Sequence, residues 1–169
     1  MPRPQTIEVR EARPEEHSAV GDVLDRAYST SYDIDEAYRD DLHHLERFVP
    51  RAEIWVALAD GAIAGALIAP SPGEPQHYVV DPPAPELGFR LLGVDPAQRG
   101  RGVGRALVGH VIALARERGL ARVGMYSAAH MIPAHRLYEQ TGFTREPWRD
   151  HAIPGHDVPL YAFALDVAP

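Results

Sequence analysis

Apolar positions recur along the chain with two different periods, one typical of strands and one typical of helices. Alternating or continuous apolar runs predict β-strands at residues 6–12, 53–59, 62–69, 86–94, 121–127, 143–146 and 158–167. Helical spacing predicts helices at residues 14–29, 35–49, 103–118 and 133–140. Strands and helices alternate without a repeat or a linker, so the pattern predicts one mixed α/β domain over residues 1–169.

The boundaries between these elements carry turn signals. Asp60-Gly61 separates two apolar runs, which is a strong β-hairpin signal. Six prolines fall within residues 70–85, so we expect a loop there, interrupted at most by a short extended piece at residues 78–80. Gly119 and Gly142 follow the last two predicted helices, where glycine commonly ends a helix.

Composition narrows the class of protein. The 169 residues are 45% hydrophobic and 24% charged, as in ordinary globular domains. A net charge of -7 argues against a nucleic-acid partner, which would require a basic face. There is no cysteine, which excludes a disulfide, a thiol nucleophile and a cysteine-bound metal. The N-terminal segment "MPRPQTIEVR" has no apolar run, so we expect no signal peptide and a cytoplasmic protein. We also expect no membrane segment, because the longest apolar stretch is interrupted by Asp60-Gly61 and is too short on either side to span a membrane.

Histidine spacing does not favour a metal site. His43 and His44 are adjacent and His130 and His135 are five residues apart, so neither pair lies on one helix face. We therefore expect no metal.

The segment "QRGRGVGRAL", Gln98 to Leu107, joins a predicted strand to a predicted helix. The first N–H groups of a helix have no partner inside it and carry partial positive charge. Glycines here let a ligand approach the backbone, and arginines add donors that suit phosphate. The segment thus predicts a pyrophosphate site, with a spacing unlike that of the P-loop or the dinucleotide fingerprint. A glycine-rich turn with solvated arginines is the alternative.

Two motifs carry a resemblance to a known family. Gln98–Gly104 matches the Q/R-x-x-G-x-G/A signature of the GNAT acyl-CoA-dependent N-acyltransferases, and "PAHRLYEQTGF", Pro133–Phe143, is similar to that family's A-x-x-L-Y-E-x-x-G-F helix. The order of elements also fits over nearly the whole chain. The resemblance implies the GNAT fold, in which about four helices flank a splayed, mixed central sheet of six to seven strands. It also implies acetyl-CoA as the donor.

The resemblance implies residue roles as well. Backbone N–H groups between Arg99 and Arg105 would hold the pyrophosphate, and Leu92 and Val94 would pair with the pantetheine amides. The same strand would offer an N–H to the oxyanion. The family's pantetheine-binding asparagine is missing from "HMIPAH", and Ser127 or His130 would replace it. The residues implied in cofactor binding are Leu92, Val94, Arg99, Gly100, Arg101, Gly102, Val103, Gly104, Arg105, Ser127 and His130.

Two residues are implied in catalysis. Tyr138 matches the tyrosine that protonates the leaving thiolate, and a core-packed ring is the alternative. The family's glutamate base falls on Gly88 in this chain. The nearest carboxylate is Glu86, two residues earlier and hence on the same face of a regular strand, from which it could act through a water. The alternative is that Glu86 is a residue of the strand edge.

The resulting hypothesis is an acetyl-CoA-dependent N-acetyltransferase. Its acceptor would be a primary amine of a small molecule or peptide, attacking directly in a ternary complex. A covalent enzyme intermediate is not needed, which agrees with the lack of cysteine. The alternative is a catalytically weak, regulatory acyl-CoA-binding module, which the glycine at position 88 favours. The acceptor, the acyl-chain preference and the oligomeric state, with a homodimer among the options, stay open.

Overall fold

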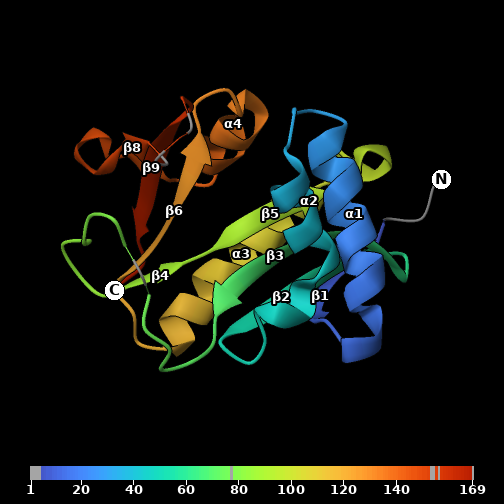
Figure 1. The fold of residues 1–169 in the computed structure, drawn as a ribbon. Helices are drawn as coiled ribbons and strands as arrows, with labels where there is room; N and C mark the ends of the chain where they lie inside the picture. The colour runs from blue at the N-terminus through green and yellow to red at the C-terminus, as the bar shows by residue number, and fades with distance from the viewer. Residues whose placement is uncertain (1–4, 77, 153–154, 156, 169) are drawn as a thin grey trace. The chain divides into compact units, whose positions relative to one another are not determined.

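We analysed a computed structural model, which describes residues 5–76, 78–152, 155 and 157–168. Within these residues lie four α-helices and nine strands in two sheets (Figure 1), which confirms the mixed α/β class. The strands exceed the predicted number because residues 86–94 form two strands and residues 151–152 form a short additional one. The chain divides into two compact units, residues 1–74 with 91–107 and residues 75–90 with 108–169.

The sheet of the first unit has the order β1-β2-β3-β5, formed by Ile7–Glu11, Ala52–Ala59, Ala62–Pro70 and Arg90–Val94. Asp60 and Gly61 connect β2 to β3 with φ of 49° and 85°. Both values are positive, as a two-residue hairpin turn requires. The predicted hairpin is confirmed.

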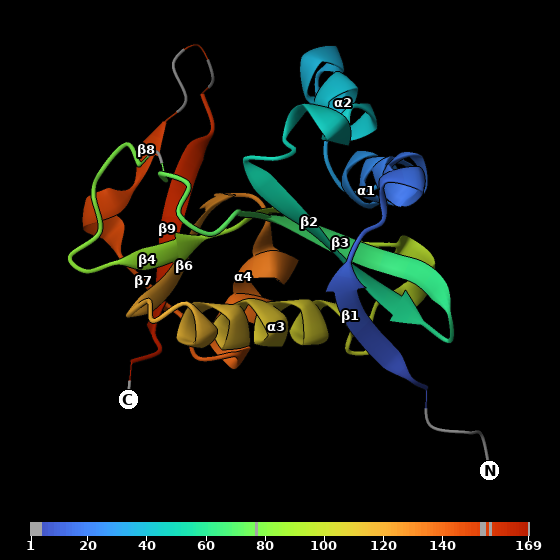
Figure 2. The ribbon, with the colours of Figure 1, turned by 90° about the horizontal axis from the view of Figure 1, so that it is seen from below.

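Two helices, α1 (His17–Ser29) and α2 (Glu36–His43), lie on one side of β2 and β3 (Figure 2). A single turn of 3₁₀ helix, Pro14–Glu16, precedes α1. The apolar face of α1 is buried, and its core residues include Val20, Val23, Leu24 and Ala27. These are the positions that the helical spacing of the sequence selects.

The continuous helix predicted over 35–49 is wrong. Here α2 ends at His43, and a separate 3₁₀ turn, Leu45–Arg47, follows. The imidazole of His44 bonds the carbonyl of Asp40 at 2.8 Å, while the His44 N–H donates to Asp41 at 3.2 Å. The His44 side chain thus bonds the Asp40 carbonyl, which would accept the His44 backbone N–H if the helix continued.

The sheet of the second unit has the order β4-β6-β9-β7, formed by Glu86–Gly88, Arg122–Ala128, Pro159–Asp166 and Thr144–Arg145. A further strand, β8 (His151–Ala152), pairs with β9. Strand β4 runs parallel to β6, while β6 and β7 run antiparallel to β9. Helix α4 (Ile132–Gln140) packs on this sheet, because the rings of His135 and Tyr138 lie 5.0 and 5.6 Å from that of Phe163.

The single strand predicted over 86–94 is also wrong. Phe89 belongs to no strand, and β4 and β5 belong to different sheets. Leu91 has φ of +56°, which a regular strand does not allow. Residues on either side of this break therefore do not share the alternation of one strand.

The helix after the glycine-rich segment, α3 (Val103–Glu117), has close to the predicted bounds. It starts in the first unit and continues in the second. No helix within the described ranges is long and apolar enough to cross a membrane.

Candidate functional site

The predicted site residues fall into two groups. The first unit brings together Leu92, Val94 and the segment 99–105. The second unit holds Glu86, Ser127, His130 and Tyr138.

The glycine-rich turn leads from β5 into α3. Asp95 caps a short 3₁₀ turn by accepting from the Ala97 N–H at 2.9 Å. Gly100 and Gly102 follow with φ of +74° and +85°, a backbone conformation that is strained for residues other than glycine. A Cβ atom on Gly100 would have nothing within 4 Å, and one on Gly102 would meet only Ile7, at 3.8 Å. The turn therefore needs glycine for its backbone conformation, and it presents bare backbone.

The start of α3 supplies donors beside this turn. The Ala106 N–H bonds the Gly102 carbonyl at 3.0 Å. The N–H groups of Val103 and Gly104 come before this bond, at the end of the helix where backbone N–H groups have no acceptor inside the helix. Aligned peptide dipoles add partial positive charge at this end. The combination suits a phosphate group.

The arginines of the turn are not equivalent. The guanidinium of Arg99 donates to the Ala27 carbonyl at 2.8 Å and lies 2.9 Å from the Ser31 hydroxyl oxygen. The exposed side chain of Arg101 donates to the Gln98 side chain at 3.3 Å. The guanidinium of Arg99, one of the groups expected to bind phosphate, thus already donates hydrogen bonds within the first unit.

The backbone of β5 lies at an edge of its sheet. The Asp95 N–H donates to Ala64 of β3 at 2.8 Å, so the alternate residues Leu92 and Val94 direct their backbone groups away from β3. The Leu92 carbonyl accepts from the Tyr28 hydroxyl at 2.9 Å. The backbone groups predicted to pair with pantetheine, those of Leu92 and Val94, therefore point away from the neighbouring strand β3.

Glu86 belongs to a buried ion network in the second unit. Both carboxylate oxygens accept from the guanidinium of Arg149, at 2.9 and 3.0 Å, and the Glu86 side chain is fully buried. Arg149 also donates to Glu146 at 2.9 Å. Burial acts to lower the pKa of Arg149, but the hydrogen bonds to the two glutamates outweigh it and raise that pKa. The carboxylate of Glu86 is thus fully engaged in an ion pair.

Glu86 and Gly88 both lie in β4 and share one face of that strand, as the spacing predicts, but the strand ends before Phe89, so this alternation does not extend to Val94. At Gly88, an added Cβ would come 2.8 Å from the Gln76 side-chain oxygen and 3.7 Å from the Tyr78 hydroxyl. The amide of Gln76 donates to the Glu86 carbonyl at 2.6 Å and accepts from the Gly88 N–H. Side chains from the proline-rich loop therefore fill the space beside Gly88.

Tyr138 projects from α4 into an aromatic cluster. Its ring lies 5.6 to 6.1 Å from the rings of Phe89, Phe143 and Phe163, and the residue is 4% exposed. Core packing accounts for the ring, and a packed ring also fixes the direction of its hydroxyl.

Ser127 is buried at the end of β6, with its hydroxyl oxygen 3.2 Å from Nε2 of His135. The same nitrogen lies 3.1 Å from the Ala128 carbonyl, which can only accept. His130 is exposed in the turn before α4. His135, which the sequence analysis considered only as a metal ligand, lies three residues before Tyr138 and so on the same helix face.

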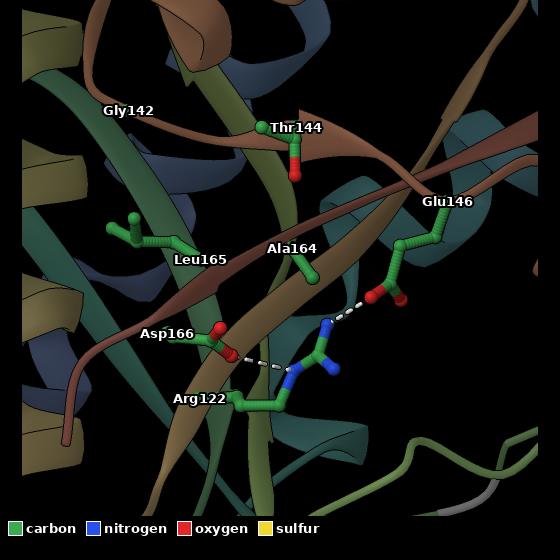
Figure 3. Close-up of a pocket in the computed structure, with 7 residues that line it drawn as sticks. All are labelled: Arg122, Gly142, Thr144, Glu146, Ala164, Leu165 and Asp166. Carbon is green, nitrogen blue, oxygen red and sulfur yellow. Dashed lines mark hydrogen bonds and ion pairs between the residues drawn. The ribbon is translucent and has the colours of Figure 1, made fainter.

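A pocket lies on the second unit, lined by Arg122, Gly142, Thr144, Glu146, Ala164, Leu165 and Asp166. Figure 3 shows the guanidinium of Arg122 between the carboxylates of Glu146 and Asp166. None of the residues predicted for catalysis or cofactor binding lines this pocket. Across the described ranges, no three His, Asp or Glu side chains are grouped to hold a metal ion.

Comparison with known proteins adds a family match. The model of the acetyltransferase (GNAT) family matches residues 17–143. The mycothiol acetyltransferase of Beutenbergia cavernae is 37% identical over 91 residues, which are 54% of this chain and 28% of that protein. The N-acetylaspartate synthetase of Xenopus tropicalis is 30% identical over 123 residues, which are 70% of this chain and 42% of that protein. The chain thus spans less than half the length of these relatives.

Solved structures share the fold. The PaiA N-acetyltransferase of Thermoplasma acidophilum, solved in complex with coenzyme A, superimposes with a TM-score of 0.72 at 13% identity. The match covers 95% of this chain and 99% of that one.

Proposed function

Because the chain belongs to the acetyltransferase (GNAT) family, we propose that it transfers an acetyl group from acetyl-CoA to a primary amine of a small molecule or peptide. The observation that carries this proposal is the turn between β5 and α3. It combines bare glycine backbone, an exposed arginine and the N-terminus of a helix.

The fit of coenzyme A rests on this turn. The backbone N–H groups of residues 99–105 would hold its pyrophosphate, since Gly100 and Gly102 carry no side chain and an added Cβ there would meet nothing closer than 3.8 Å. The N–H groups of Leu92 and Val94 point away from β3 and would pair with the pantetheine amides. Bound there, acetyl-CoA supplies an acetyl thioester. Ser127 and His130 stay the proposed replacements for the missing asparagine, although the hydroxyl of Ser127 already faces His135.

Tyr138 is the proposed general acid. It would donate its phenolic proton to the departing sulfur, which needs only a weak acid because a thiol has a pKa near 8.5. The aromatic cluster around the ring holds the donor in one orientation. One of the β5 N–H groups would donate to the oxyanion as the amine attacks.

Removal of the amine proton is assigned differently from the sequence hypothesis. Glu86 would have to leave a two-point bond with Arg149 before it could accept a proton. We therefore propose that solvent water takes the proton and that Glu86 serves the buried network.

A second function has one observation in its favour. Gly88 has no carboxylate, and Gln76 fills the space beside it. A chain that binds acyl-CoA but transfers the acetyl group slowly, a regulatory module, would fit this arrangement.

One experiment separates the two functions. Thermal unfolding with acetyl-CoA or CoA reports binding, and at a hundredfold excess over Kd the stabilisation should be about 2.7 kcal/mol. Thiol release across a panel of amines reports transfer. Binding with amine-dependent thiol release supports the transferase, and binding without it supports the module. An unfolding temperature unmoved by both ligands refutes both proposals.

A further inference from the structure

The segment that carries the proposed phosphate turn is tied to the end of α1 by side chains. Both belong to the first unit. Three side-chain hydrogen bonds, or ties, join the two segments. They are made by Arg99, Arg26 and Tyr28, and we call this set the α1 clamp.

Arg99 makes the central tie. One arm of its guanidinium donates to the carbonyl of Ala27, within the last turn of α1. The other arm lies 2.9 Å from the hydroxyl oxygen of Ser31, just beyond the helix. Nε of the same group points to the Val94 carbonyl at 3.4 Å. The last carbonyls of a helix lack partners inside it and carry partial negative charge, so a cation is favourable at this end.

The other two ties fix the chain before the turn. Arg26 pairs with Asp95 at 2.8 Å, and this ion pair lowers the pKa of Asp95. Asp95 in turn caps the 3₁₀ turn that leads to Arg99. The Tyr28 hydroxyl donates to the Leu92 carbonyl on β5, and the ring lies over Gly93, where an added Cβ would come 3.4 Å from it.

We propose that Arg99 is a positioning residue, which holds the phosphate-binding turn by capping α1 and does not bind phosphate with its side chain. This inference rests on the proposed function only for the identity of the ligand. Ser31 and Ala27 are accepting partners that a phosphate would have to displace. Arg101, two residues along, donates to the Gln98 side chain of its own turn. The two arginines are therefore a matched pair with different tasks.

The test compares Arg99→Lys with Arg101→Lys. Lysine keeps the charge but cannot reproduce the planar fork that reaches two acceptors at once. For Arg99→Lys without ligand we expect Tm to fall by about 2–4 °C, as for the loss of one interaction in a chain of this size. The Kd for CoA should rise about threefold to tenfold with an unchanged salt dependence, because the net charge is kept. For Arg101→Lys without ligand we expect a Tm within about 1 °C of the parent, because this guanidinium is exposed and bonds only a neighbouring side chain, that of Gln98, among the described residues.

Ser31→Ala gives an independent arm, because it leaves every charge in place. It should lower Tm and raise the Kd for CoA in the same sense as Arg99→Lys. In the double variant the two effects should be less than additive, since both remove one interaction.

The proposal is overturned if Arg99→Lys keeps the parental Tm, or if Arg99→Lys and Arg101→Lys behave alike. It is also overturned if Arg99→Lys weakens CoA binding while Tm is unchanged, because the side chain would then contact the ligand itself. A parent chain that binds no CoA would sink the proposed function. The Tm comparison without ligand would still decide the proposal about Arg99.

Discussion

Replacing Glu86 by glutamine tests whether this carboxylate stabilises the fold or takes part in the reaction. Both oxygens of Glu86 accept from Arg149, whose side chain is 2% exposed, and Nε of Arg122 lies 3.5 Å away. Glutamine keeps the shape but loses the charge, and it turns one acceptor into an NH₂ group facing a guanidinium. Breaking one side of a buried ion pair costs about 3–5 kcal/mol.

Arg149 keeps its bond to Glu146, so we expect the lower end of that range, about 3 kcal/mol. For a chain of this size that is a fall of roughly 6–12 °C in Tm. Urea unfolding at neutral pH measures the same loss as a lower midpoint with an unchanged slope. Asp166→Asn is the matched control. It also removes a carboxylate 3.5 Å from Arg122, but that carboxylate is 84% exposed and should contribute less than about 0.5 kcal/mol.

The double replacement Glu86→Leu with Arg149→Met gives a second comparison. Removing both charges together should cost much less than removing Glu86 alone, because no buried charge is left unpaired. The reasoning fails if Glu86→Gln unfolds like the parent. If that variant also transfers acetyl groups about 10²-fold more slowly at neutral pH, the general-base role of Glu86 returns.

Three further outcomes are expected. Tyr138→Phe should slow acetyl transfer by roughly 10²–10⁴-fold in a thiol-release assay while the Kd for acetyl-CoA stays unchanged, and parental turnover would assign Tyr138 to packing alone. Gly102→Asp should abolish CoA binding in calorimetry with a native circular-dichroism spectrum, because it places a negative side chain on bare backbone. Burial lowers the pKa of His135 below 6.5 in the folded state, so the unfolded chain binds the proton more readily and stability is lost as pH falls from about 7. His135→Gln should flatten this part of a stability–pH curve, and an unchanged curve would show that His135 does not titrate there.

The sequence predicted those turns whose backbone conformation depends on the residue types within the turn. Asp60-Gly61 and the turn at Gly100 and Gly102 have positive φ, and glycine or aspartate at such positions marks them in the sequence. Leu91, next to the break in the predicted strand 86–94, has a positive φ although it is not glycine. The pattern of apolar residues therefore gave no sign of the break. The end of α2 is set by the His44 side chain, which competes for a backbone carbonyl and leaves no mark in the hydrophobic period.

Side-chain partners from distant segments could not be predicted in this way. Arg149 lies in "PWRDHAIPGHD", which is polar and rich in turn residues, and an arginine there is ordinarily exposed. Its burial depends on Glu86, 63 residues earlier in the chain. A spacing rule compares positions within one element, and this pair joins a 3₁₀ turn to a strand of the sheet.

Gly88 stands where the family's glutamate base would be, and the Gln76 side chain fills the space beside it. The carboxamide of Gln76 carries a donor and an acceptor in one plane, and it bonds the Glu86 carbonyl and the Gly88 N–H as a neighbouring strand would. The Tyr78 hydroxyl donates to that carboxamide at 2.7 Å. A Cβ at position 88 would lie 2.8 Å from the Gln76 oxygen, so a glutamate there would require the end of the Gln76 side chain to shift. A carboxylate at position 88 would therefore displace Gln76 from its bonds with the Glu86 carbonyl and the Gly88 N–H.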